Sequence, residues 1–302
     1  MSDPRVSVVI VSFNTREDVL RCLASLRDHL SLPHEVIVVD NASEDGTVAA
    51  VRADHPEALL VENARNLGFS AANNRGLARA RGPFVLILNS DAEVRPGMVE
   101  ALLERLEAHP EVGLIGPRTV DGDGVIQVSF GPPLTPLREW QQRRLVRGVK
   151  ARRPAALAQA QARAAHEHEP AWISASCLLA RREALQAIGG FDEGFFLYEE
   201  DVDLCLRAGR AGWGVLFTPA AEVVHHLGRS MARTPHRARL EYHRSHLRYY
   251  RKHNGLNATL LLRGYLSLLG LLGWLRALGP GGPRRQARDL AADIFRLGWH
   301  GN

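Results

Sequence analysis

The chain has 302 residues, of which 45% are hydrophobic and 24% are charged, and this balance supports a folded core and excludes a wholly disordered protein. Its three cysteines, Cys22, Cys177 and Cys205, are far apart and lack metal-ligand spacing, so neither a disulfide framework nor a zinc ribbon is expected. The net charge of +5 fits an anionic partner but does not choose among nucleic acid, anionic lipid and a phosphorylated small molecule. The first apolar run is too short for a signal peptide, which predicts cytosolic synthesis without export.

Four short apolar, β-branched segments alternate with helical periodicity in the first 91 residues. They are residues 6–13, 34–40, 58–63 and 83–91. This alternation predicts an α/β fold, in which helices cover both faces of a mostly parallel sheet. Ligands of such sheets bind beyond the carboxyl ends of the strands. The polar residues at those ends are therefore candidates for a binding site: Ser12, Phe13, Asn14, Asp40, Asn41, Asn66 to Gly68, Asn89, Ser90 and Asp91.

The later part of the chain changes in character twice. Residues 98–113 have the pattern of an amphipathic helix that ends at His109-Pro110, and strands follow it. Residues 131–170 are rich in proline, then in basic residues, then in alanine; with few large apolar residues, they predict an exposed helical insertion or flap. The core resumes at residue 171.

The tail contains a leucine-rich segment, residues 256–279. A membrane-spanning helix needs ~20 mostly apolar residues, but Arg263 and Arg276 interrupt this segment. We favour a helix that lies on the membrane surface or docks within the protein, because the basic residues upstream of it suit anionic lipid.

Several candidates have both a structural and a functional interpretation. Asp91, directly after a buried strand, either forms an Asx turn or binds a cation. Asp40 either belongs to a capped turn or accepts a hydrogen bond from a nucleobase or ribose. Gly68 allows close approach of a ligand to the backbone, and the helix after it offers amides to a phosphate. His225 is either structural or a ligand for Mn²⁺.

Four acids are crowded into five positions after an aromatic run, in the stretch "FFLYEEDVD". Asp203 is explained as a helix residue that pairs with Arg207 at i, i+4. The crowding of Glu199, Glu200 and Asp201 is not explained in this way. Like charges beside apolar surface raise the pKa of one carboxylate, which suits it to general-base catalysis.

Taken together and in order, six stretches resemble the family-2 inverting glycosyltransferases with the GT-A fold, and most closely the bacterial rhamnosyltransferase-like members. The stretches are "VSVVIVSFNTREDVLRCLASL", "EVIVVDNASEDGT", "NLGFSAANNRGL", "LILNSDAEV", "LLARREALQAIGGFDEGFFLYEEDVDLCLRAGRAGWGV" and "AEVVHHLGRS". They cover roughly residues 5–130 and 171–252.

The resemblance implies a role for each candidate. The implied catalytic base is Asp201, with Glu200 beside it. A divalent cation, Mg²⁺ or Mn²⁺, would be held by Asp91 and His225, with His226 as the fallback, and Asn89 replaces the usual first acid of the metal-binding motif. The implied contacts to the nucleotide sugar are Ser12, Phe13, Asn14, Asp40, Asn66, Gly68, Asn73, Asn89, Ser90 and Asp91. The implied acceptor-side residues are Phe196, Tyr198 and Trp213.

The resemblance also predicts the organisation and the reaction. Residues 1–130 form the nucleotide-sugar half, 131–170 the basic, alanine-rich flap, 171–235 the acceptor and catalytic-base half, and 236–302 a basic helical tail. The expected enzyme is metal-dependent and inverting. It transfers a sugar, with dTDP-rhamnose the favoured donor, to a hydroxyl of a lipid-linked or growing cell-surface glycan. It would be cytoplasmic and peripheral on the inner membrane face, with anionic lipid as a partner and no nucleic acid.

Two alternatives remain from the sequence. A sugar nucleotidyltransferase would need a glycine-rich basic loop after the first strand, and "VSFNTRED" offers none. A non-catalytic membrane scaffold that binds nucleotide sugars would not need both Asp91 and Asp201.

Overall fold

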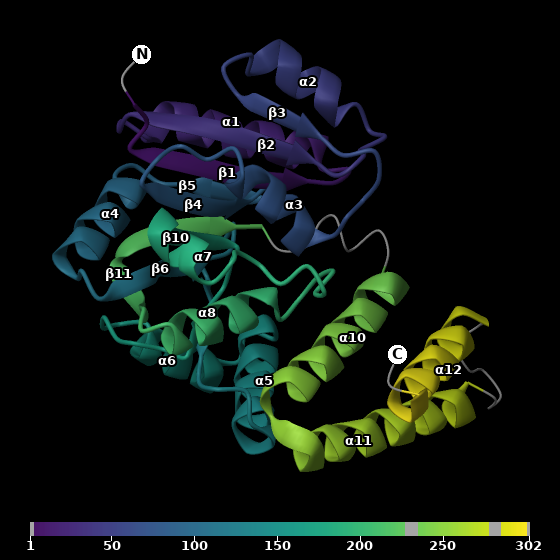
Figure 1. The fold of residues 1–302 in the computed structure, drawn as a ribbon. Helices are drawn as coiled ribbons and strands as arrows, with labels where there is room; N and C mark the ends of the chain where they lie inside the picture. The colour runs from purple at the N-terminus through teal and green to yellow at the C-terminus, as the bar shows by residue number, and fades with distance from the viewer. Residues whose placement is uncertain (1–2, 227–234, 278–284, 301–302) are drawn as a thin grey trace. The chain divides into compact units, whose positions relative to one another are not determined.

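The computed structural model describes residues 3–226, 235–277 and 285–300 (Figure 1). The chain divides into two compact units. The first consists of Met1–Glu193 and Asp201–Ser230, and the second of Gly194–Glu200 and Met231–Asn302. The predicted parts 1–130 and 131–170, and most of 171–235, thus belong to one unit. The three cysteines are buried and free, as expected.

The four predicted apolar segments form parallel strands in the first unit. They are β1 (Val6–Ser12), β2 (His34–Asp40), β3 (Leu59–Glu62) and β4 (Phe84–Asn89). The helices between them are α1 (Arg16–His29), α2 (Thr47–Asp54) and α3 (Phe69–Leu77). The α/β prediction for this part is confirmed.

The second half of the sheet is mixed, because β10, β5 and β7 run antiparallel to the strands they pair with. The strand order is β3-β2-β1-β4-β10-β6-β11-β5, and β7 pairs with β6. Strand β10 (Cys177–Arg181) is antiparallel to both β4 and β6 (Val112–Val120), whereas β11 (Gly214–His225) is parallel to β6. The sheet is completed by β5 (Ala92–Val94) and β7 (Ile126–Gln127). Since β10 is reversed, its first residues, and not its last, lie beside the carboxyl end of β4.

Alternate residues of each strand enter two hydrophobic layers, one on each face of the sheet. Val8 of β1 packs with the buried side of α1 and of α4 (Met98–Ala108), the predicted amphipathic helix. Val9 faces the other layer, with residues of α3 and of α8 (Glu200–Arg210). The short helix α7 (Arg182–Ala187) follows β10 and ends before two glycines with positive φ.

The segment 131–170 is helical, as predicted, but it is not exposed on all sides. Helices α5 (Pro136–Lys150) and α6 (Pro154–Arg163) follow β8 (Phe130–Gly131) and precede β9 (Trp172–Ile173), which pairs with β8. Leu145 and Val149 are buried in the second hydrophobic layer. The helices approach each other closely because Gly148 lacks a Cβ, which would lie 2.5 Å from the Cβ of Ala156. The segment is therefore partly buried although it has few large apolar residues, because Gly148 and Ala156 let the two helices pack closely.

Three helices lie in the described residues 235–277 and 285–300 of the second unit: α10 (Pro235–His253), α11 (Gly255–Arg276) and α12 (Arg285–His300). Helix α11 is the predicted leucine-rich segment, whose last two residues lie outside the described ranges. Its backbone closely approaches α12, since a Cβ on Gly270 would lie 2.6 Å from the backbone nitrogen of Phe295. By length and composition alone, α11 is the one helix in the described part of the chain that could cross a membrane.

Candidate active site

Asp40 lies at the carboxyl end of β2 with its side chain 2% exposed. Its Oδ2 accepts a hydrogen bond of 2.8 Å from the backbone N–H of Ser43, which forms the capped turn. Its Oδ1 is buried and has no hydrogen-bond partner among the described residues. Leaving a buried carboxylate oxygen unpaired is costly, so this atom is suited to a donor group from a ligand.

Asn14 fixes the turn after β1 against the turn after β2. Its backbone N–H donates to Ser43 Oγ at 2.9 Å, and its Oδ1 accepts from the N–H of Glu44 at 2.7 Å. Its φ is +54°, a left-handed conformation that asparagine tolerates better than most residues. Ser12, Asn14 and Asp40 are therefore brought to the same edge of the sheet, as predicted.

Three hydroxyl groups connect the end of β1 with the turn after β4. Ser12 Oγ lies 3.0 Å from Thr15 Oγ1, which lies 3.1 Å from Ser90 Oγ. Thr15 precedes α1 as its N-cap residue but makes no side-chain cap hydrogen bond. Its hydroxyl instead connects Ser12 with Ser90, a role that the sequence patterns do not single out. The sequence does contain a signal for Thr15: a threonine directly before a helix is a typical N-cap residue, and this one follows Ser12 by three positions.

The loop before α3 is held by asparagines. Asn66 Oδ1 accepts from the N–H of Gly68 at 2.9 Å, and Asn41 Nδ2 donates to the carbonyl of Gly68 at 3.1 Å. Gly68 has φ +86°, which favours glycine. Asn73 lies inside α3, fully buried, and donates to the carbonyl of Phe69 at 2.9 Å. Its Oδ1 has no hydrogen-bond partner in the described part of the chain.

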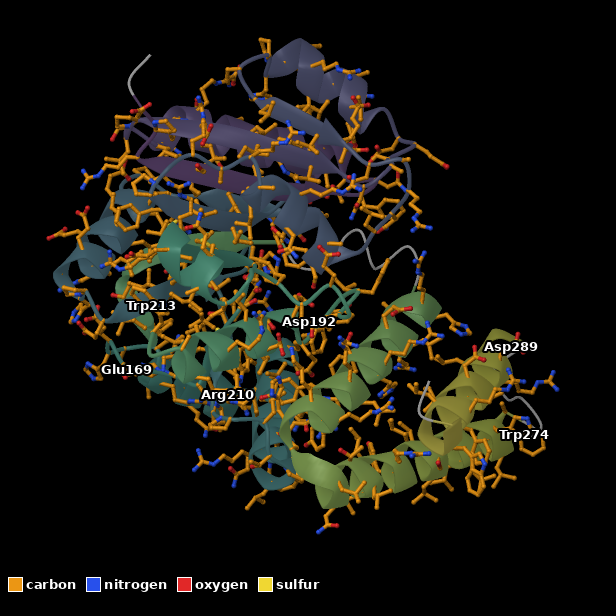
Figure 2. All side chains as sticks on the ribbon, in the orientation of Figure 1. Glu169, Asp192, Arg210, Trp213, Trp274 and Asp289 are labelled. Atoms are coloured by element: carbon orange, nitrogen blue, oxygen red, sulfur yellow. The ribbon has the colours of Figure 1, made fainter. Side chains whose placement is uncertain are left out.

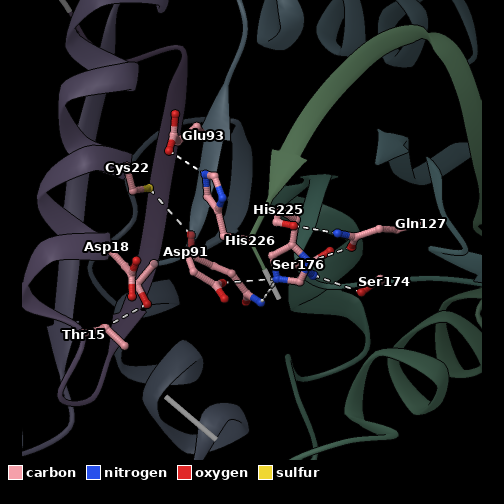
Figure 3. Close-up of polar contacts among 12 residues, drawn as sticks. Thr15, Asp18, Cys22, Asp91, Glu93, Gln127, Ser174, Ser176, His225 and His226 are labelled. Atoms are coloured by element: carbon pink, nitrogen blue, oxygen red, sulfur yellow. Dashed lines mark hydrogen bonds and ion pairs between the residues drawn. The ribbon is translucent and has the colours of Figure 1, made fainter. Parts of the chain in front are cut away.

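The predicted metal residues do lie together (Figure 3). Asp91 follows β4, His225 ends β11, and His225 Nε2 is 3.2 Å from Asp91 Oδ1. Asn89 Nδ2 is 3.3 Å from the same imidazole nitrogen. His226 lies elsewhere: its Nε2 is 2.7 Å from Glu93, so the fallback ligand is not the one that faces Asp91.

Gln127 determines which nitrogen of His225 carries the proton. Its Nε2 donates to the backbone carbonyl of His225 at 2.6 Å, which fixes the orientation of the amide. Its Oε1 then faces His225 Nδ1 at 3.1 Å and accepts from it. Nδ1 therefore carries a proton, and Nε2 faces both the Asn89 amide and the Asp91 carboxylate.

A lone pair and a carboxylate oxygen at 3.2 Å repel each other unless a proton or a cation lies between them. Metal–ligand distances of about 2.1 Å place adjacent octahedral ligands roughly 3 Å apart, so the pair fits a cation such as Mg²⁺ or Mn²⁺. No group of three His, Cys, Asp or Glu side chains suited to a metal occurs in the described ranges. A metal bound here would need further ligands from a substrate or water.

Asp201 lies near the same edge of the sheet. Its Oδ2 accepts from the N–H of Ala175 at 3.3 Å and its Oδ1 from the N–H of Val202 at 2.8 Å. The next residue, Ser176, accepts at its carbonyl from the N–H of Asn89 at 2.9 Å. The reversed strand β10 thus puts the proposed base and the end of β4 on the two sides of one short segment, residues 174–176.

The predicted acceptor-side residues belong to two different units of the structure. Phe196 and Tyr198 belong to the second unit, where the guanidinium of Arg237 lies 4.9 Å from the centre of the Phe196 ring and the Tyr198 ring 5.8 Å from that of Tyr242. Tyr198 has a positive φ, and burial together with the charge of Glu200 raises the pKa of its phenol. Glu200 is buried in the same unit.

Trp213, labelled in Figure 2, belongs to the first unit. It precedes β11 at the end opposite to His225, and a Cβ on Gly113 would lie 2.8 Å from its Cβ. The paired stretch of β6 from Val112 to Val120 has eight residue steps, or about 26 Å. The length of a strand therefore separates Trp213 from the carboxyl edge of the sheet, and its assignment to the acceptor side stays a prediction.

Comparisons with known proteins agree with the geometry. A family model described as glycosyl transferase family 2 matches residues 7–163. The chain is 36% identical over 248 residues to the N-acetylglucosaminyl-diphospho-decaprenol L-rhamnosyltransferase of Mycobacterium tuberculosis, covering 76% of this chain and 78% of that protein. It is 30% identical over 225 residues to the pre-mycofactocin glycosyltransferase of the same species, covering 73% and 42%.

Two solved structures have a similar fold. One is the mannosyltransferase PcManGT from Pyrobaculum calidifontis in complex with GDP-Man and Mn²⁺, with a TM-score of 0.58, 21% identity, and coverage of 100% of this chain and 77% of that chain. The other is S. aureus TarS 1–349, with a TM-score of 0.54, 16% identity, and coverage of 99% and 92%. At these identities the similarity concerns the fold.

Proposed function

This chain belongs to glycosyl transferase family 2 and is a glycosyltransferase with the GT-A fold, and from this premise we propose that it transfers rhamnose to a lipid-linked glycan. The donor we favour is dTDP-rhamnose, and the acceptor is a hydroxyl of an N-acetylglucosaminyl diphosphate on a lipid. The similarity to the mycobacterial rhamnosyltransferase, which extends over most of both chains, supports this choice. Family membership removes the basis for the nucleotidyltransferase and scaffold alternatives.

One observation carries the mechanism: residues 174–176 contact Asp201 on one side and the end of β4, beside Asp91, on the other. A displacement at a sugar carbon needs a leaving-group site and a base on opposite sides of that carbon. In this chain the donor side consists of the turns after β1, β2 and β4, and the acceptor side begins at Asp201.

On the donor side, we assign the unpaired Oδ1 of Asp40 to the nucleobase or ribose, with Ser12, Phe13 and Asn14 around it. Asn66, Gly68 and Asn73 belong to the loop and helix that follow β3, and Asn89, Ser90 and Asp91 to the turn that faces the diphosphate. Asp91 and His225 would hold a divalent cation, Mg²⁺ or Mn²⁺. When bound, such a cation acts as a Lewis acid toward the leaving nucleoside diphosphate.

On the acceptor side, Asp201 takes the proton of the attacking hydroxyl. The oxygen of that hydroxyl forms a bond to the anomeric carbon while the bond to the diphosphate breaks, so a single displacement inverts the anomeric centre. Two backbone N–H groups, from Ala175 and Val202, keep the carboxylate oriented. Glu200 and the nearby Phe196 and Tyr198 stay assigned to the acceptor side by their position in the sequence.

Replacement of Asp201 with Asn tests this assignment, because the amide keeps the shape of the side chain but cannot act as the base. We expect the transfer rate to fall by at least about 100-fold. Donor binding, measured as the thermal shift caused by the nucleotide diphosphate with Mg²⁺ or Mn²⁺, should be retained. The control is Asp123→Asn, at an acid whose side chain is 76% exposed, and it should leave the rate unchanged. Full activity of Asp201→Asn would overturn the mechanism.

We place the enzyme at the cytoplasmic face of the membrane, as a peripheral protein. A lipid-linked acceptor confines the reaction to a membrane, and α11 and the basic helix before it offer a surface for anionic lipid.

A further inference from the structure

We infer that a second site in the first unit, a basic hollow between α5 and α6, binds the diphosphate of the lipid-linked acceptor. This inference rests on the proposed function, since it gives a location to one chemical group of the proposed acceptor. The hollow is separate from the Asp91–His225 pair and is lined by none of the residues that the family resemblance singled out.

The hollow has a volume of ≈ 800 Å³, and its walls come from both helices. Four arginines line it, and no acid does: Arg138 and Arg144 on α5, Arg153 before α6, and Arg163 at the end of α6. None of these four has a carboxylate within salt-bridge distance among the described residues. The acid on α5, Glu139, pairs with Arg143, which is not part of the lining.

Arg163, one of the lining residues, is held by two contacts. Its Nη1 donates to Gln142 Oε1 at 3.0 Å, and its guanidinium lies 5.4 Å from the centre of the Phe130 ring. Gln142 is buried, and its Nε2 donates to the carbonyl of Phe130 at 2.8 Å. Burial lowers the pKa of Arg163, which reflects the cost of holding its charge there without a carboxylate. One guanidinium can donate two parallel hydrogen bonds to a phosphate group. Four arginines without a carboxylate in the lining therefore suit a ligand that carries more than one phosphate, such as a diphosphate.

The hollow is connected to Asp201 through the β8–β9 ladder. Its rim begins at Pro132, one residue after Gly131, which pairs with Trp172. Three residues beyond Trp172, the N–H of Ala175 donates to Asp201. One strand spacing and four residue steps, one from Pro132 to Gly131 and three from Trp172 to Ala175, amount to roughly 18 Å at most. About eight bonds separate a hydroxyl of a hexose from the second phosphorus of its diphosphate, which is roughly 10 Å. With its hydroxyl at Asp201, the diphosphate of one sugar therefore lies more than halfway toward the rim of the hollow, and the long arginine side chains must bridge the rest.

The exposed edge of the hollow on α5 suits the lipid part of the same acceptor. Leu137 and Trp140 are three positions apart on α5, and their side chains are 66% and 54% exposed. The guanidinium of Arg144 lies 5.8 Å from the centre of the Trp140 ring. Exposed tryptophan and leucine among arginines are typical of helices that lie at the membrane interface, where a lipid chain leaves the bilayer for the protein.

The kinetic test compares two acceptors that differ only in the diphosphate: undecyl N-acetylglucosaminyl diphosphate and undecyl N-acetylglucosamine. We expect the wild-type enzyme to prefer the first, and the double variant Arg138→Gln/Arg144→Gln to lose about tenfold of that preference in kcat/KM. The matched control is Arg147→Gln/Lys150→Gln, which removes the same charge from exposed positions of α5 outside the hollow. The control should keep the wild-type preference. An equal loss in both variants, or no loss in either, would overturn the inference.

A binding test separates this inference from the proposed function. Trp140 lines the hollow, so undecyl diphosphate should change its fluorescence, and Trp140→Phe identifies that contribution among the five tryptophans. We expect the Kd for undecyl diphosphate to rise about tenfold in Arg138→Gln/Arg144→Gln. Binding that depends on these arginines, without transfer to either acceptor, would refute the function and leave the site in place. Transfer without such binding would refute the site alone.

Discussion

At the scale of single residues, the sequence singled out Asp91 and His225 together, but not Gln127, the residue that orients the His225 ring. Asp91 was visible because it directly follows a buried strand, and His225 because it ends one. Gln127, which fixes the tautomer of His225, is 98 residues away in sequence. Its contact depends on the pairing of β7 with β6, which no local pattern predicts.

Metal removal and replacement of His225 test the pair. We expect a chelator to abolish transfer and added Mn²⁺ to restore it. In His225→Ala, the Mn²⁺ concentration for half-maximal activity should rise by about tenfold or more, because one of the two proposed protein ligands is lost. His226→Ala is the matched control, as His226 pairs with Glu93, and its metal dependence should stay near that of the wild type. If the two variants behaved alike, His225 would not be a ligand.

At the scale of elements, strands were predicted well and their directions less well. The β-branched runs that become β1, β2 and β4 are recognisable because both faces of a central strand are buried. The reversal of β10 has no signature in its five residues, and this reversal is what brings Ala175 and Ser176 to the site. The sequence predicts exposed helices at α5 and α6, because large apolar residues are few there. Hydrophobicity patterns do not reveal that Gly148 allows the two helices to pack closely and to bury small residues.

Helix α8 depends on a pair that was predicted but whose burial was not. The Asp203 side chain is fully buried, and its Oδ2 is 2.6 Å from Nε of Arg207, which also donates to the carbonyl of Ile188. Removing one partner leaves a charge with little access to water, so we expect Asp203→Ala to lower the free energy of unfolding by about 3 kcal/mol or more.

Urea unfolding, followed by circular dichroism, measures this change. The control is Asp123→Ala, which removes the acid of the exposed pair with Arg152 and should cause almost no change in stability. A loss of stability in Asp203→Ala as small as that of the control would show that the buried pair contributes little.

At the scale of the whole molecule, the α/β unit was predictable and the role of the tail is less so. Compositional patterns predicted a helix at α11 but did not reveal its close contact with α12, which depends on Gly270. Many leucines of α11 remain exposed, among them Leu256 at 73% and Leu261 at 64%. An apolar surface of this kind next to a basic helix is suited to a lipid membrane.

The full chain should therefore sediment with vesicles that contain phosphatidylglycerol and only weakly with phosphatidylcholine vesicles. Because attraction between exposed charges is screened by salt, we expect the bound fraction to fall severalfold between 0.1 M and 0.5 M NaCl. Release by salt would support a peripheral enzyme. Binding that withstands salt and alkaline carbonate and yields only to detergent would show instead that α11 spans the bilayer.

The two-residue ladder between β8 and β9 has a consequence for the length of the segment that it closes. The chain leaves the sheet at Gly131 and returns at Trp172, so the two ends of the intervening segment lie about 5 Å apart. The entropic cost of closing a loop rises slowly with its length. A longer or shorter segment between Gly131 and Trp172 should therefore change the cost of closing the loop only a little, while the strands that carry Asp40 and Asp91 stay as they are.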